Sequence, residues 1–399
     1  MKSTTPFLLM ICLANGAQAS GFALIEQNAS GMGNAYAGAA ALAEDASTIY
    51  FNPAGLSHIE GRQFVLAGHL ILPSAKFKDD GSTLAVLGDG GDAGKLAVVP
   101  NFYYAMDLTP DLKFGLGVNA PFGLTTEYDG TWAGQVQAIK SELKTININP
   151  TLAWRLNEKF SLGFGLDWQY VEAELTQATA AVPNPPRAVM KGDDTSLGWN
   201  VGVLWDLDSA SRIGLAYRSG FSHQLTGTLN ALPGVGVYAN LSLPESTSLS
   251  YMRRLNSRWD VLADVTKTGW GDFQKLEVRV QSNNGLISSV DESWQDTWRY
   301  SLGLNYHPSR EWTWRVGLAT DQAPVPDASH RTARIPDADR LWVAFGGQYR
   351  FDQKRAMDFG YAHLFVDDSR VDHFNNLTWL RGTYENKIDI LSVQYTQNF

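Results

Sequence analysis

The chain has 399 residues, of which 44% are hydrophobic and 12% aromatic, and its formal net charge at pH 7 is −9. Because this balance is acidic, nucleic acid is a poor partner. The one cysteine, Cys12, lies in the N-terminal leader described next, so the rest of the chain has neither a disulfide nor a thiolate ligand for a metal. Beyond the leader no apolar run reaches the ~20 residues of a transmembrane helix.

Residues 1–19 are predicted to be a secretory signal peptide. Lys2 precedes an apolar run over residues 7–14, and residues 17–19 read A-x-A, as at a cleavage site. The apolar run is shorter than the ~20 residues that span a bilayer, which argues against a permanent anchor. We expect cleavage after Ala19 and export of the mature chain.

Residues 20–61 follow a different pattern, because Gly and Ala dominate positions 31–43. A segment with so few large apolar side chains has two interpretations. It is either a disordered leader or a compact hatch that plugs the lumen of a barrel, where small side chains allow close approach to strand backbones. We favour the hatch.

From residue 62 to Phe399 the chain reads as β-strands with one apolar face. In residues 160–170 every even position is apolar and every odd position is small or polar, which is the period of a strand. Fourteen strands are predicted, at residues 62–73, 95–107, 112–121, 139–156, 159–178, 194–207, 211–228, 241–255, 258–281, 295–307, 311–321, 339–351, 355–366 and 384–399. Splitting 258–281 would give fifteen, whereas single-chain bacterial barrels have even numbers.

The second face of these strands distinguishes a barrel from a water-soluble sandwich. It is rich in Gly, Ser and Asn rather than Lys and Glu. Aromatic residues near strand ends suit the girdles of a membrane barrel; they are Trp154, Tyr170, Trp205, Trp259, Trp270, Trp298 and Trp312. We therefore expect an all-β fold, a 14-stranded antiparallel transmembrane β-barrel over residues 62–399 with an N-terminal hatch over 20–61, in a bacterial outer membrane.

The third predicted strand contains a disruption. Pro121 has no N–H to complete a ladder, and Gly123 permits a bend. Either the wall has a gap here, or the strand simply ends at Pro121.

Two other classes of function fit less well. An enzyme would need clustered catalytic groups, but the seven histidines are scattered, and neither H-E-x-x-H nor G-x-S-x-G occurs. We expect no catalytic residue, no cofactor and no metal, and we interpret acidic pairs such as Asp79 with Asp80 as solvated loop residues rather than cation ligands. A general porin would keep an open lumen, which a hatch blocks.

Several segments in order resemble the FadL/TodX family of outer-membrane transporters for long-chain fatty acids and other hydrophobic compounds. The N-terminal matches are residues 20–22, 30–38 and 44–46 and, above all, Asn52, Pro53 and Ala54. Further matches extend the likeness across the mature chain; they are residues 122–128, 198–200, 217–219, 324–326, 335–337 and 339–340.

The resemblance implies a mechanism. A ligand is captured by an apolar groove in the outer loops, binds inside the barrel and leaves sideways through a wall gap at a kink in the third strand. The matching gap residues are Asn119, Ala120, Pro121, Phe122 and Gly123, expected to face Asn52, Pro53 and Ala54 of the hatch. Phe22 and Gly202 are expected along the passage. Gly202, on the lumen face between Val201 and Val203, matches a family glycine there, although the curvature of the barrel alone would also account for it. The expected partners are a hydrophobic small molecule and outer-membrane lipid, with the protein as a monomer.

The sequence departs from the family at two interior positions that are basic in its best-studied fatty-acid members. They align here with Gln177 and Val290, which are not basic. Arg187, Lys191 or Arg218 would then contact a carboxylate, although the first two also read as ordinary solvated loop charges. Long-chain fatty acids remain the expected cargo, with neutral aromatic or aliphatic hydrocarbons as the alternative.

Overall fold

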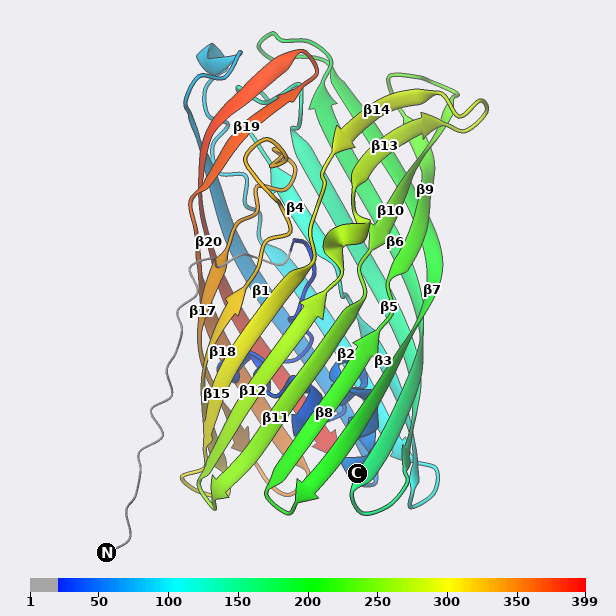
Figure 1. Cartoon of the computed structure of the whole chain (residues 1–399), viewed down its shortest axis with the longest axis vertical. Helices are drawn as coiled ribbons and strands as arrows, with labels where there is room; N and C mark the ends of the chain where they lie inside the picture. The colour runs from blue at the N-terminus through cyan, green and yellow to red at the C-terminus, as the bar shows by residue number, and fades with distance from the viewer. Residues whose placement is uncertain (1–20) are drawn as a thin grey trace, which may run out of the picture.

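The structure is a computed structural model that describes residues 21–399. These residues form one antiparallel sheet that closes on itself, because β1 (Arg62–Asp79) pairs with β2 (Ala97–Asp107) on one side and with β20 (Thr378–Asn398) on the other. The chain runs along the wall from one end of the barrel to the other fourteen times, and we call each such passage a crossing. This number confirms the predicted barrel. Figure 1 shows short turns at the end where the C-terminus lies and longer loops at the opposite end. The predicted signal peptide lies outside the described residues.

Eight crossings are single strands and six are interrupted. The single strands are β1, β2, β5 (Lys140–Arg155), β6 (Phe160–Ala178), β7 (Arg187–Asp208), β16 (Trp312–Asp321), β17 (Arg340–Arg350) and β20. The interrupted crossings are β3 (Leu112–Asn119) with β4 (Gly123–Glu127), β8 (Ser211–Arg218) with β9 (Phe221–Leu229), β10 (Gly236–Leu243) with β11 (Ser246–Asn256), β12 (Trp259–Thr268) with β13 (Lys275–Val280), β14 (Leu286–Asp291) with β15 (Thr297–Tyr306), and β18 (Arg355–Val366) with β19 (Ser369–Asn375).

The outer face of the wall carries an apolar belt. On β6 the side chains of Leu162, Phe164 and Leu166 are 40%, 48% and 56% exposed, whereas the residues between them are buried. Stacked aromatic rings border the belt near the short turns, as where Phe160 and Trp205 lie 5.6 Å apart between ring centroids. A continuous apolar surface of this kind fits hydrocarbon, with aromatic residues at the boundary to water.

The strands extend further toward the long loops than the sequence predicted. β1 continues to Asp79 rather than residue 73, β7 begins at Arg187 rather than 194, and β20 begins at Thr378 rather than 384. These ends project beyond the apolar belt, so their outer faces have no need for apolar residues and the period-two pattern is lost. Residues 258–281 form a single crossing as expected, but the 3-10 helix η4 (Trp270–Asp272) interrupts it.

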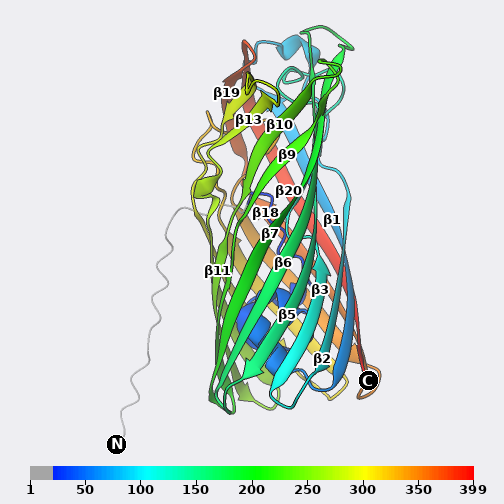
Figure 2. The same ribbon diagram turned by 90° about the vertical axis from the view of Figure 1, so that its right-hand side faces the viewer.

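Residues 21–61 fold inside the barrel, mostly in the half with the short turns (Figure 2). This enclosed segment contains η1 (Met32–Asn34), α1 (Ala39–Leu42), α2 (Thr48–Phe51) and η2 (Pro53–His58), and another 3-10 helix, η3 (Ala85–Leu87), lies in an outer loop. η1 packs on β16, β17 and β18, α1 on β8 and β11, and η2 on β5, β6 and β7. Within residues 21–399, no helix is long and apolar enough to cross a membrane.

Wall glycines let the enclosed segment approach the strand backbones. A Cβ atom on Gly214 would lie 1.9 Å from the carbonyl oxygen of Ala40, and one on Gly317 would lie 2.1 Å from the carbonyl carbon of Asn34. Both distances are well below van der Waals contact. Any larger residue at either position therefore has to displace the enclosed segment or the wall.

We expect Gly214→Ala to loosen α1 inside an intact barrel. Overpacking of this kind costs about 1–3 kcal/mol, and the added methyl group meets backbone that cannot rotate away. Hydrogen exchange of residues 39–42 should become faster while the barrel keeps its heat-resistant gel mobility. The matched control is Gly68→Ala, because nothing lies within 4 Å of a Cβ there. Equal exchange in the two variants would contradict this account.

Candidate functional site

The third crossing is broken between β3 and β4. Both strands pair with β5, but β3 ends at Asn119 opposite Asn147 and β4 begins at Gly123 opposite Lys144. Between them, the Thr145 hydroxyl accepts from Phe122 N at 3.1 Å and donates to Phe122 O at 2.7 Å, in place of the regular ladder. The chain therefore bends inward at Pro121 and then resumes the same crossing.

This bend opens a window in the wall toward β2. β2 pairs with β3 from Asp107 only as far as Phe102, and the next contact between these parts of the wall is the bridge from Gly94 to Thr126. Residues 97–101 of β2 and residues 119–123 of the third crossing thus face each other without a ladder between them. We call this opening the wall window.

The inner side of the wall window is occupied by residues 21–27, the N-terminal segment. Ala23 bridges Phe122 as in an antiparallel pair, with hydrogen bonds of 2.8 Å from Leu24 N to Pro121 O and 3.0 Å from Gly123 N to Phe22 O. The Gln27 side-chain amide donates to Ala120 O at 3.1 Å. Through these bonds the N-terminal segment pairs with the kinked strand where β2 does not.

A cavity of 680 Å³, the upper cavity, lies between the N-terminal segment, the wall window and the outer loops. Some of its lining residues face the lumen, among them Trp342 and Leu364, which are 1% exposed. Others, Leu96, Val98 and Ile146, face away from the barrel and are 64%, 65% and 51% exposed. The lining of the cavity at the wall window therefore includes residues of both the lumen side and the bilayer side of the wall.

Phe22 anchors the N-terminal segment in an aromatic cluster. Its ring centroid lies 4.7 Å from that of Trp270, 5.7 Å from Trp294, 6.1 Å from Phe273 and 6.3 Å from Phe122. The breaks at η4 and at residues 292–296 turn both tryptophans into the lumen, where they are 0% and 1% exposed. The expectation that Trp270 belongs to a membrane girdle is therefore wrong.

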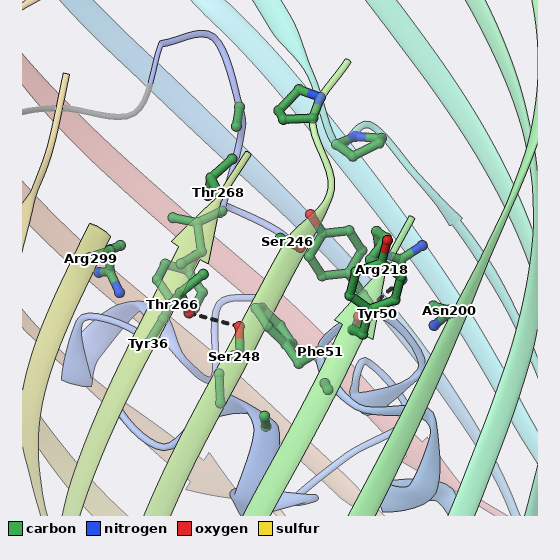
Figure 3. Close-up of a pocket in the computed structure, with 18 of the residues that line it drawn as sticks. Tyr36, Tyr50, Phe51, Asn200, Arg218, Ser246, Ser248, Thr266, Thr268 and Arg299 are labelled. Carbon is green, nitrogen blue, oxygen red and sulfur yellow. Dashed lines mark hydrogen bonds between the residues drawn. The ribbon is translucent and has the colours of Figure 1, made fainter. Parts of the chain in front are cut away.

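A second cavity of 110 Å³, the lower cavity, lies below the N-terminal segment, and its lining includes several hydroxyl groups (Figure 3). Ser246, Ser248, Thr266 and Thr268 line it from β11 and β12, with 2.7 Å between the hydroxyls of Ser248 and Thr266. Arg218 also lines it. Its guanidinium is 2.5 Å from Asp167, donates to Tyr50 O at 3.0 Å and lies 4.5 Å above the Tyr50 ring.

Asn52, Pro53 and Ala54 lie deeper in the lumen than expected and face other strands. The Asn52 amide donates to Ala40 O at 2.7 Å and to Val203 O at 3.0 Å, and its oxygen accepts from Ala54 N at 3.0 Å. A Cβ on Gly202 would lie 1.9 Å from this oxygen, so glycine is needed there for the approach of the enclosed segment. Pro53 shares the lower cavity with Pro121 and Phe122, but the residues whose backbone pairs with the window are 22–24.

The other two basic candidates lie away from both cavities. Lys191 points outward from β7 and pairs with Glu174 at 2.8 Å, with 61% of its side chain exposed. Arg187 is exposed at the start of the same strand. Neither is positioned to meet a molecule in the lumen. No group of three or more His, Cys, Asp or Glu residues in the described part of the chain could hold a metal ion.

Comparison with known proteins gives this architecture a family. The family model described as outer membrane protein transport protein (OMPP1/FadL/TodX) matches residues 10–399. The chain belongs to this family. A long-chain fatty acid transport protein of Escherichia coli O6:H1 is 29% identical over 395 residues, 88% of each chain. Outer membrane protein P1 of Haemophilus influenzae is 30% identical over 406 residues, 89% of this chain and 88% of its own.

Solved structures of the FadL/TodX family agree with the fold. A FadL homologue of Pseudomonas aeruginosa matches with a TM-score of 0.88 and 26% identity, covering 95% of this chain and all of its own. The toluene transporter TodX of Pseudomonas putida matches with a TM-score of 0.68 and 21% identity, covering 89% and 94%, and supports the fold alone. Like the relatives named for the outer membrane, this family member is an outer-membrane protein.

Glu26 is a titratable residue of the N-terminal segment that the sequence did not single out. Its carboxyl group lines the upper cavity and is 5% exposed. Burial raises its pKa to about 7, against smaller opposing effects of a backbone hydrogen bond and of Arg340. Arg299 and Asp321 are the other charges that act on it. Between about pH 4.5 and pH 7, the Glu26 carboxyl group is therefore mostly protonated when the N-terminal segment is folded and mostly ionised when the segment is opened.

We expect the N-terminal segment to open more readily at high pH. The pKa of Glu26 in the folded segment is raised above the ordinary value of 4.5. The stabilisation of the folded segment by protonated Glu26 is therefore complete below pH 4.5 and is lost as pH rises through 7, and the loss is roughly 3 kcal/mol at most. Hydrogen exchange of residues 22–27 should be faster at pH 8 than at pH 5.5, after correction for intrinsic rates. Glu26→Gln should remove this dependence. Identical pH profiles for the two proteins would contradict it.

Proposed function

We propose that this FadL/TodX family member takes up hydrophobic molecules across the outer membrane, with long-chain fatty acids as its main cargo. The molecule is captured at the outer loops, binds in the upper cavity and leaves sideways through the wall window. The observation that carries the proposal is the lining of the upper cavity, which includes both buried lumen residues and residues on the bilayer side. Residues 20–61 act as the hatch of residues 62–399.

The outer loops offer apolar surface for a first contact. Val86 and Leu377 are 93% and 88% exposed, and Phe374 is 53% exposed. Leu377 also has a positive φ of 60°, a conformation that non-glycine residues rarely adopt. When large exposed apolar side chains bind an apolar molecule, their surface is removed from water. This burial stabilises the contact by about 25 cal/mol for each Å² of apolar surface.

Release into the bilayer is favoured over release through the lumen. An alkyl chain gains about 0.8 kcal/mol for each CH₂ group removed from water, and the wall window opens beside the apolar belt. The lumen below is filled by buried polar contacts, such as Arg315 with Asp358 at 2.7 Å and with Glu44 at 2.9 Å. An apolar molecule in the upper cavity therefore meets a polar obstacle below it and hydrocarbon beside it.

Uptake of neutral hydrocarbons is the second candidate. One observation favours it: Arg218 is already paired with Asp167, and Arg187 and Lys191 lie outside the lumen. For either cargo we propose a transport role without an enzymatic step, carried out by a monomer whose apolar belt is in contact with outer-membrane lipid.

The function is tested by uptake in cells whose own route for hydrophobic molecules has been deleted. Expression of the chain should restore uptake of labelled oleate, with toluene as the neutral comparison. Faster uptake of a small sugar would instead indicate an open pore. Failure to restore uptake of either hydrophobic molecule, with the protein folded in the outer membrane, would contradict the proposal.

We expect closure of the wall window to slow uptake without weakening binding. Pro121→Val restores an N–H, and Gly123→Val adds a β-branched side chain that meets Leu24, so β3 and β4 should merge into one strand. An added barrier of about 1.4 kcal/mol lowers the rate about tenfold. Gly68→Val, on the bilayer side of β1, is the control. Normal uptake by the double variant would contradict lateral release.

A further inference from the structure

Asn119 is a buried polar residue at the wall window, and its amide oxygen has no hydrogen-bond donor. It is the last residue of β3, directly before the break in the third crossing, and 2% of it is exposed. Its side chain faces the lumen and lines the upper cavity. Among residues 21–399 no group donates to Asn119 Oδ1. The Tyr103 hydroxyl lies beside this side chain, but its proton goes to Gln27 O at 3.0 Å.

Other polar side chains in the lining of the upper cavity have their partners within the protein. The Thr145 hydroxyl makes two hydrogen bonds with the backbone of Phe122. The Asp337 carboxylate accepts from Gly21 N at 2.8 Å and pairs with Arg340 at 2.7 Å. These groups have no need of a ligand.

Within the described part of the chain, three further side chains of this lining have a buried polar atom without a partner. They are Arg340, Asn386 and Trp342. Arg340 and Asn386 are fixed by hydrogen bonds of their other atoms. The indole N–H of Trp342 can only donate, so it does not distinguish one ligand oxygen from another. Asn119 is the unpartnered acceptor at the wall window, which a released molecule passes in the proposed function.

The surroundings of Asn119 indicate what kind of molecule would supply the donor. Its neighbours Val118, Ala120 and Phe122 also line the cavity and are apolar. Binding sites of this kind are mostly apolar, with a few polar groups that give specificity. A plain acyl chain covers the apolar surface but offers the amide nothing. A hydroxyl group on that chain is both a donor and an acceptor, so it satisfies the amide from either end.

The position of Asn119 also indicates which part of the chain it meets. The lining extends from Ile335 and Pro336 of the outer loop between β16 and β17 to the wall window. A molecule whose head group stays near the outer loops therefore presents its chain, and not its head group, to Asn119.

We propose that Asn119 makes the upper cavity selective for acyl chains that carry a hydroxyl group near the middle of the chain, with this hydroxyl donating to Asn119 Oδ1. The inference rests on the proposed uptake function and narrows its substrate class. An unsubstituted chain leaves the buried amide without a partner. A hydroxylated chain exchanges a hydrogen bond to water for one to the protein, so the two differ in affinity at this one contact.

The test compares oleate with ricinoleate, which is oleate with one added hydroxyl at mid-chain, as ligands of the purified full-length protein. The measured quantity is the ratio of their dissociation constants, because differences in partitioning into detergent cancel between variants. The wild type should favour ricinoleate. Asn119→Leu removes the hydrogen-bonding capacity and should lower this preference about three- to tenfold.

Two further variants complete the experiment. Asn119→Ala repeats the test without added volume and should lower the preference by a similar factor. Asn240→Leu is the matched control and should keep the wild-type preference, because Asn240 is exposed on β10 and lines neither cavity.

The outcomes separate this inference from the function on which it rests. If both Asn119 variants keep the wild-type preference, or weaken both ligands by the same factor, Asn119 has a structural role and the assignment is overturned while the uptake function stands. A wild type that binds both ligands without favouring ricinoleate also overturns the assignment alone. A wild type that binds neither ligand overturns the uptake function and the assignment together.

Discussion

The wall of this barrel depends on one constraint: in hydrocarbon, every backbone N–H and C=O needs a partner within the protein. The closed sheet meets this demand almost everywhere, and β1 paired to β20 completes the ring. At the wall window the partner of the kinked strand is the N-terminal segment, through Leu24 N to Pro121 O and Gly123 N to Phe22 O. The same bonds that complete the wall therefore also close its side opening.

The N-terminal segment separates two cavities in the lumen. Above it, the upper cavity is mostly apolar and is lined by residues of both sides of the wall. Below it, the lower cavity has hydroxyl groups and the ion pair of Arg218 with Asp167 along its lining. The ion pairs of Arg218 with Asp167 and of Arg315 with Asp358 fill the lumen below. In the proposed function, movement of a few residues near Phe22 opens the side route while these ion pairs stay in place.

The sequence predicted the wall better than it predicted the contacts inside it. A period of two is local, so it predicts the fourteen crossings, and the residue types of Pro121 and Gly123 predict the disruption. Pairing of Leu24 with Pro121 joins residues far apart in the chain and leaves no periodic pattern. The expectation that Asn52 to Ala54 face the window comes from the family resemblance alone. The prediction for Trp270 is wrong because a tryptophan at an inward break in a strand and a tryptophan of the girdle have the same position near a strand end in the sequence. The sequence did not show which face Lys191 lies on, because the alternation of apolar and polar residues ends where β7 extends beyond the apolar belt.

We propose that the N-terminal segment must separate from the kinked strand for cargo to leave. Ala23 and Phe122 form a bridge flanked by the two hydrogen bonds above, so their Cα atoms should be about 4.5 Å apart, within reach of a disulfide. The measurement is oleate uptake by Ala23→Cys/Phe122→Cys, oxidised and then reduced, with Ser248→Cys/Thr266→Cys as a control pair between strands that remain paired. The account predicts that oxidation stops uptake and reduction restores it in the first pair alone. Equal uptake by its oxidised and reduced forms would contradict the account.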